Sequence, residues 1–134
     1  MQGKMKVGLG LMVIALFTGN AYADTATCPP ATAIKEQPLK DGGFSYSAPG
    51  PEGRMWTGEN EYAAKSYLGK VNFTNAKFNT DSQAVICSYE GDGEAGIRLA
   101  LKPFNQWKAA NGTAWQKQDC ADSDISKCSF EYQK

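Results

Sequence analysis

The residues of this chain best suited to chemistry are carboxylates, because the sequence contains no histidine. Histidine is the commonest general acid or base in enzymes. Glu90, Asp92 and Glu94 fall close together and could supply the carboxylate pair of a glycan hydrolase. Acidic residues are also common in turns, where they stay solvated and bond the local backbone. The pattern therefore favours a solvated turn over a catalytic pair.

A second acidic group, Asp119, Asp122 and Asp124, lies near the end of the chain. The D-x-D spacing suits calcium, but the glycine and terminal glutamate of an EF-hand loop are missing. Zinc and a redox-active thiol pair are disfavoured by the lack of histidine and of a C-x-x-C motif. We expect no catalytic residue, no metal and no cofactor.

The chain has four cysteines, Cys28, Cys87, Cys120 and Cys128. An even number in a small exported domain is typical of disulfides, so we expect two bridges and no free thiol. Three pairings are open. We favour Cys120–Cys128 because these two are close in sequence, which leaves Cys28–Cys87.

The first 23 residues are typical of a cleaved export signal. Lys4 and Lys6 precede an apolar run over residues 7–17, which is too short to cross a membrane, and Ala21-Tyr22-Ala23 suits a signal peptidase. An uncleaved anchor is the less favoured alternative. We predict a signal peptide over 1–23 and one domain over 24–134, with no membrane span after cleavage. The bacterial character of the signal indicates the periplasm or the medium.

Composition limits the partners. Cleavage would remove Lys4 and Lys6 and leave 12 basic and 14 acidic residues, so the domain lacks the basic footprint of a nucleic-acid binder. A chain of this length forms one domain and buries roughly 65% of its extended surface. We expect no nucleic-acid partner.

Residues 83–103 carry the clearest structural pattern. Val85, Cys87 and Tyr89 alternate with more polar positions, and a glycine-rich turn over 91–96 leads to a second alternating run. This pattern predicts a β-hairpin with Cys87 on its core face. Residues 71–79 change phase near Thr74, which predicts a third antiparallel strand that either carries a β-bulge near Thr74-Asn75 or is partly buried on both faces.

The remaining segments are shorter. We expect a helix over 31–37 that ends at Pro38, because the residue before proline avoids the α region. Other expected elements are strands at 44–48, 54–57, 115–118 and 129–132, and a short helix or structured loop at 104–112. Residues 62–67 have enough apolar side chains for one to two helical turns, but no clean apolar face emerges. The sequence therefore predicts an α+β fold. It has a small antiparallel sheet of about six to seven strands, one short N-terminal helix and two disulfides.

Aromatic residues give the better hint of function. The predicted mature chain has 13, and most should build the core. Trp56 and Trp107 lie in turn-rich, polar neighbourhoods. Together with Tyr62 and Tyr67 they form a candidate surface for binding a protein or a glycan.

Five stretches resemble a known family: ATCPPATAIKE, MWTGEN, VNFTNAKF, ICSYEG and CSFEY. The family comprises short exported bacterial proteins and is described only as a domain of unknown function. The resemblance covers roughly residues 28–130, and its motifs are scaffold features. It implies compartment and fold, and it brings no catalytic residue.

These observations favour a non-catalytic binding or inhibitor module in the periplasm or outside the cell. One alternative is a structural or effector-type component of a secreted assembly. The other is an envelope-glycan hydrolase that uses a carboxylate pair. The identity of the ligand and the oligomeric state do not follow from the sequence.

Overall fold

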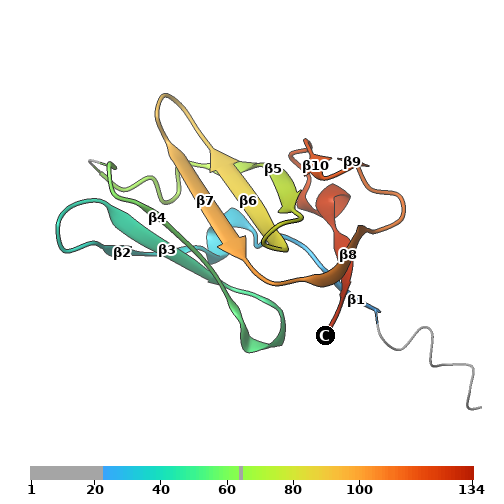
Figure 1. Ribbon diagram of the computed structural model, residues 1–134. Coiled ribbons are helices and arrows are strands. Elements are labelled where there is room, and N and C mark those ends of the chain that lie inside the picture. The colour runs from blue at the N-terminus through green and yellow to red at the C-terminus, as the bar shows by residue number, and fades with distance from the viewer. Residues whose placement is uncertain (1–22, 64) are drawn as a thin grey trace, which may run out of the picture.

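The computed structural model describes residues 23–63 and 65–134, and nearly all regular structure there is β (Figure 1). The strands are β1 (Ala23–Ala26), β2 (Lys35–Pro38), β3 (Phe44–Pro49), β4 (Met55–Asn60), β5 (Asn72–Asn79), β6 (Ala84–Glu90), β7 (Gly96–Leu101), β8 (Asn105–Ala109), β9 (Trp115–Gln116), β10 (Asp119–Cys120) and β11 (Phe130–Gln133). They form a three-stranded sheet, β1-β11-β8, and an eight-stranded sheet, β2-β3-β4-β7-β6-β5-β10-β9. All strand pairs are antiparallel.

The prediction of an α+β fold with an N-terminal helix is wrong. The 31–37 segment contains only one 3₁₀ turn, η2 (Ala31–Ala33), before β2 begins. β2 pairs with β3 from Lys35 opposite Ser47 to Pro38 opposite Phe44. A helix this short is marginal on its own because helix nucleation is costly. Pairing with a neighbouring strand satisfies the same backbone groups without that cost, so tertiary context overrides the local pattern.

Two further strands, β8 and β1, were not predicted, and the number of strands exceeds the six to seven expected. The 104–112 segment, predicted as a short helix or loop, contains β8, which pairs with β11. β1 pairs along its whole length with β11. In the described ranges the remaining helical structure is 3₁₀ only, η3 (Pro51–Gly53) and η4 (Ile125–Cys128). None of these helices has the length and apolar character needed to cross a bilayer.

The central meander is present: β6 pairs with β5 on one side and with β7 on the other. The register shift between Phe73 and Asn75 places a bulge where the sequence changes phase. Val85, Cys87 and Tyr89 of β6 are fully buried. The predicted core face of the hairpin is therefore the observed one.

The core lies between the two sheets and is rich in aromatic rings. Phe104, in the connection from β7 to β8, is at its centre. Its ring centroid lies 5.9 Å from that of Trp56, 4.9 Å from that of Phe130 and 5.1 Å from that of Tyr132. Trp56 belongs to the large sheet and the other two residues to the small one. These contacts join the sheets through one aromatic cluster.

Two disulfides fasten this core, Cys28–Cys87 and Cys120–Cys128, the pairs favoured from the sequence. Cys28 follows β1 of the small sheet, whereas Cys87 lies in the middle of β6 of the large sheet. The long-range bridge therefore links the two sheets covalently. Beside it, the Tyr89 hydroxyl donates a hydrogen bond to the Pro29 carbonyl at 2.6 Å.

Candidate functional site

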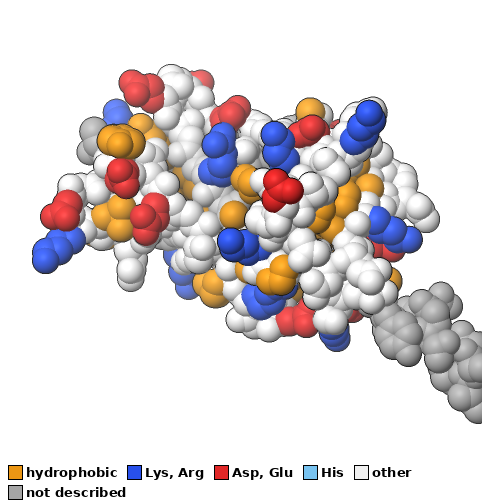
Figure 2. Space-filling view, in the orientation of Figure 1, with side chains coloured by type: hydrophobic (Ala, Val, Ile, Leu, Met, Phe, Trp, Pro, Cys, Tyr) orange, Lys and Arg blue, Asp and Glu red, His pale blue; other side chains and the backbone are white. Residues whose placement is uncertain are grey.

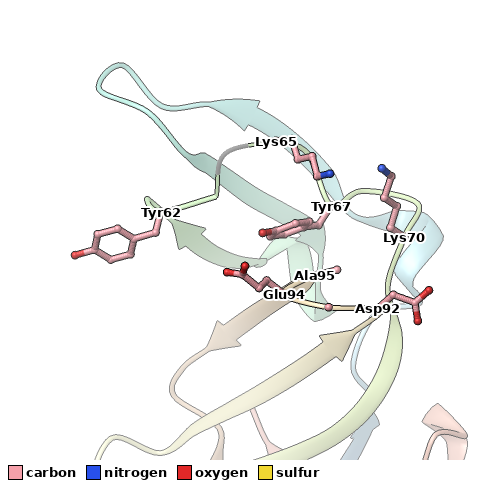
Figure 3. Close-up of a pocket in the computed structure, with 8 residues that line it drawn as sticks. Tyr62, Lys65, Tyr67, Lys70, Asp92, Glu94 and Ala95 are labelled. Atoms are coloured by element: carbon pink, nitrogen blue, oxygen red, sulfur yellow. The ribbon is translucent and has the colours of Figure 1, made fainter.

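A cavity of about 650 Å³ lies between the loop that follows β4, residues 61–70, and the turn that joins β6 to β7 (Figure 3). We call it the loop–turn cavity. Its lining residues are Tyr62, Lys65, Tyr67, Lys70, Asp92, Gly93, Glu94 and Ala95. Its volume falls within the range of about 300–1,000 Å³ that is usual for small-molecule sites. Other hollows among the described residues, including two of about 270 and 290 Å³, are smaller.

Three hydrogen bonds shape the described parts of the 61–70 loop, residues 61–63 and 65–70. At its start, the Tyr62 backbone N–H donates to the Asn60 side chain at 3.1 Å. In its middle, the Ser66 hydroxyl donates to the Glu36 carboxylate of β2 at 2.6 Å. At its end, the Lys70 N–H donates to the Tyr67 carbonyl at 2.9 Å. These bonds position the lining side chains without regular secondary structure.

The two walls of the cavity meet at Gly91. A Cβ atom at this position would overlap the carbonyl group of Lys70, so only glycine allows this approach. The turn itself is closed by hydrogen bonds from Gly91 N–H to the Ala95 carbonyl and from Ala95 N–H to the Asp92 carbonyl. The glycine-rich turn is thus shaped to fit against the 61–70 loop.

Two tyrosines give the cavity its aromatic character. Tyr67 is half-buried and, like Ala95 opposite, packs against the hydrophobic core. Tyr62 is 88% exposed, and its ring points away from the other lining side chains (Figure 3). Tyr67 therefore presents a fixed aromatic face, whereas Tyr62 stands at the rim.

Four charged residues surround these rings. Lys65, Lys70, Asp92 and Glu94 are all exposed. The ion pairs found in the described part of the chain, Lys77–Asp119, Lys108–Glu131 and Lys134–Asp24, involve none of the four. Elsewhere on the face drawn in Figure 2, acidic and basic side chains are interspersed. The loop–turn cavity thus combines both signs of charge with an aromatic surface.

The four candidate binding residues do not form one surface. Trp56 is 1% exposed and belongs to the core. The Trp107 ring stacks on Phe78 at 4.5 Å and meets Trp115 edge-on at 4.8 Å. Its indole N–H is buried without a hydrogen-bond partner. Only Tyr62 and Tyr67 line the loop–turn cavity. Trp56 and Trp107 were predicted to be surface residues because their neighbours in the sequence are polar.

The three acidic residues of the β6–β7 turn, Glu90, Asp92 and Glu94, do not share one site. Asp92 and Glu94 line the loop–turn cavity, whereas Glu90 lines a separate hollow beside Arg98. In Figure 3 the carboxylates of Asp92 and Glu94 point in different directions. The structure therefore does not gather the three carboxylates at one point.

The second acidic group serves local backbone structure. Asp122 accepts a hydrogen bond from the Asp124 N–H at 2.8 Å, and Asp124 accepts one from the Ser126 N–H at 3.0 Å at the start of η4. Hydrogen bonds from the Ser126 hydroxyl and N–H lower the pKa of Asp124. Within residues 23–63 and 65–134, no group of three or more histidine, cysteine or acidic side chains is placed to hold a metal ion.

Three tyrosines with raised pKa values belong to the scaffold. Burial raises the pKa of Tyr89. Burial, followed by a hydrogen bond to Glu52, raises the pKa of Tyr132 to about 12. Burial and then the nearby Glu36 carboxylate raise the pKa of Tyr46. These groups stay neutral and hydrogen-bonded or buried at physiological pH, as structural tyrosines do.

Sequence reasoning missed Lys65 and Lys70. A pattern that could have indicated them is present, because two tyrosines and two lysines alternate within nine residues, Tyr62-Lys65-Tyr67-Lys70. The segment has no helical or strand period, so nothing in it indicated which side chains share a face.

Comparison with known families agrees with the five stretches quoted above. The chain matches, over residues 22–131, the family described as "Protein of unknown function (DUF3757)". The chain belongs to the DUF3757 family. The resemblance to a family of unknown function is thereby confirmed. No curated protein and no solved structure matches this chain. Membership in DUF3757 brings no activity with it, so functional inference depends on the loop–turn cavity.

Proposed function

We propose that this domain is a non-catalytic binding module that works after export, in the periplasm or outside the cell. The loop–turn cavity is where it takes its ligand. The single observation that carries the proposal is the fixed Tyr67 ring, set in a cavity of about 650 Å³ among charged side chains that form no ion pairs with one another. Ligand sites commonly combine an apolar surface with a few placed polar groups in this way.

The exposure of the 61–70 loop supports the same proposal. The large hydrophobic side chains that are exposed in the described residues are Met55, Tyr62 and Leu68, and two of these three lie on this loop. Exposed aromatic and aliphatic groups beside a pocket are typical of a surface that binds a partner. The scaffold beneath is cross-linked by two disulfides, which suits an oxidising compartment.

The test is retention of envelope material by the immobilised domain, residues 24–134. We expect a glycan or protein fraction to be retained by the wild type and lost with Tyr67→Ala. Met55→Ala is the matched control, because it truncates another exposed hydrophobic side chain, at the far end of β4. Circular dichroism would verify that both variants fold. Equal retention by wild type and Tyr67→Ala, or retention of nothing, would contradict the proposal.

A further inference from the structure

The loop–turn cavity has the chemistry of a site for a sugar acid. Resting on the binding function proposed above, we infer that its ligand is a saccharide carrying a carboxylate, such as a uronic acid residue of a glycan. The inference comes from three parts of the cavity: an aromatic face, a cationic side and a hydrogen-bond acceptor.

The aromatic face is Tyr67. Its ring is half-buried and held against the core, and its loop is fixed by the Ser66–Glu36 hydrogen bond. A side chain fixed in this way loses little conformational entropy when a ligand binds. Tyrosine presents an apolar ring together with a polar hydroxyl, which suits a ligand whose C–H face is apolar and whose edge is polar. A sugar ring has that character.

The cationic side consists of Lys65 and Lys70. Figure 3 shows their ammonium groups on the same side of the Tyr67 ring. Neither lysine belongs to the ion pairs of the described residues, so both can meet an anionic ligand without first breaking such a pair. Two ammonium groups on one rim favour a carboxylate in the space between them.

The acceptor is Glu94, whose carboxylate lies on the other side of Tyr67 from the two lysines (Figure 3). An ionised carboxylate only accepts hydrogen bonds, so it suits sugar hydroxyls. Glu94 and the second lining carboxylate, Asp92, repel negative charge, so they disfavour a phosphate dianion more strongly than a singly charged carboxylate. The cavity lining contains no arginine, the residue that binds phosphate in a bidentate manner. A singly charged, hydroxyl-rich ligand fits both sides of the cavity.

The experiment is calorimetric titration of the domain, residues 24–134, with three forms of one oligosaccharide. These are the uronate, its methyl ester and the neutral sugar of the same linkage. We expect the uronate to bind about tenfold more tightly than the ester, since two solvent-exposed ion pairs are at stake. Added salt should weaken binding of the uronate but not of the ester.

The matched variants carry equal changes of charge. Lys65→Gln with Lys70→Gln should lower the affinity for the uronate about tenfold and leave that for the ester unchanged. Lys117→Gln with Lys127→Gln removes the same charge from exposed positions near β9 and η4, and it should leave both affinities unchanged.

The outcomes separate the ligand class from the binding function. Equal binding of all three sugars would overturn the acidic class and leave a neutral-glycan site. If no sugar binds while envelope material is retained in a Tyr67-dependent way, the saccharide is wrong and the binding function stands. If neither sugar nor envelope material depends on Tyr67, the binding function itself fails.

Discussion

The two disulfides should differ in their contribution to stability, because they close loops of very different length. Their cysteines are separated by 59 and 8 residues. The chain-entropy model assigns about 4.3 kcal/mol to Cys28–Cys87 and about 2.6 kcal/mol to Cys120–Cys128. The difference of about 1.7 kcal/mol corresponds to roughly a 20-fold change in the folding equilibrium constant. Either value is a large part of a total stability of about 5–15 kcal/mol.

The comparison uses two double variants, Cys28→Ala with Cys87→Ala and Cys120→Ala with Cys128→Ala. All four cysteines are 0% exposed, so the loss of buried sulfur is similar in the two variants and largely cancels. Guanidinium unfolding followed by tryptophan fluorescence reports on the core through Trp56. We also expect a larger denaturant slope for the first variant, because its unfolded chain is less constrained and exposes more surface.

An equal loss of stability on removal of Cys120–Cys128 and of Cys28–Cys87 would refute the loop-entropy explanation. That result would mean that native contacts around the short loop outweigh the entropy of the long one. Reduction of the wild-type protein is the control, and it should be at least as destabilising as the costlier double variant.

Three smaller predictions concern the scaffold. The contribution of Tyr132 and Tyr89 to stability should be constant up to about pH 10 and fall between about pH 10 and 12, because unfolded tyrosines ionise there while the two folded tyrosines stay protonated. A urea midpoint that does not move between about pH 10 and 12 would contradict this prediction. Tyr132→Phe removes the 2.7 Å hydrogen bond to Glu52 and should lower the free energy of unfolding by about 1–2 kcal/mol at pH 7. In the same urea assay, the variant should lose less stability at high pH than the wild type. Gly58→Ala places a Cβ atom against the Arg98 carbonyl and should lower the free energy of unfolding by about 1–3 kcal/mol in a thermal or urea assay. Gly96→Ala is the control, because its Cβ atom would make only an ordinary contact at 3.8 Å. It should change the free energy of unfolding by about 0.5 kcal/mol or less.

Cavity geometry gives one more check. Gly91→Ala should push the β6–β7 turn away from Lys70 and weaken any Tyr67-dependent binding severalfold. A variant that folds and binds like the wild type would show that the contact between the two walls is not needed for the site.

Local sequence patterns were sufficient for the centre of the fold. The alternation around Cys87 places one face of β6 in the core, because successive side chains of a strand point to opposite sides. The phase change near Thr74 marks the bulge in β5. The short spacing of Cys120 and Cys128 favours their pairing. In each case neighbours in the chain carry the information.

Non-local pairing decided the rest. β2 could not be separated from a short helix because its character comes from β3, and β8 likewise depends on β11. Trp56 was predicted to be exposed because its neighbours in the sequence are polar, but its ring packs near Phe104 in the core. Strand propensity depends on packing partners, which a single segment does not reveal.

The candidate site was likewise predicted only in part from the sequence. By itself the sequence determined the antiparallel meander around Cys87 and favoured the two observed disulfide pairs. It also named Tyr62 and Tyr67 as candidate binding residues, which stays a prediction. Only the tertiary structure placed Tyr67 and Ala95 in the lining of one cavity and set Lys70 beside Gly91, residues more than twenty positions apart in the chain. The physical reason is that an aperiodic loop acquires its shape from the surface it packs on, whereas a strand carries its own period.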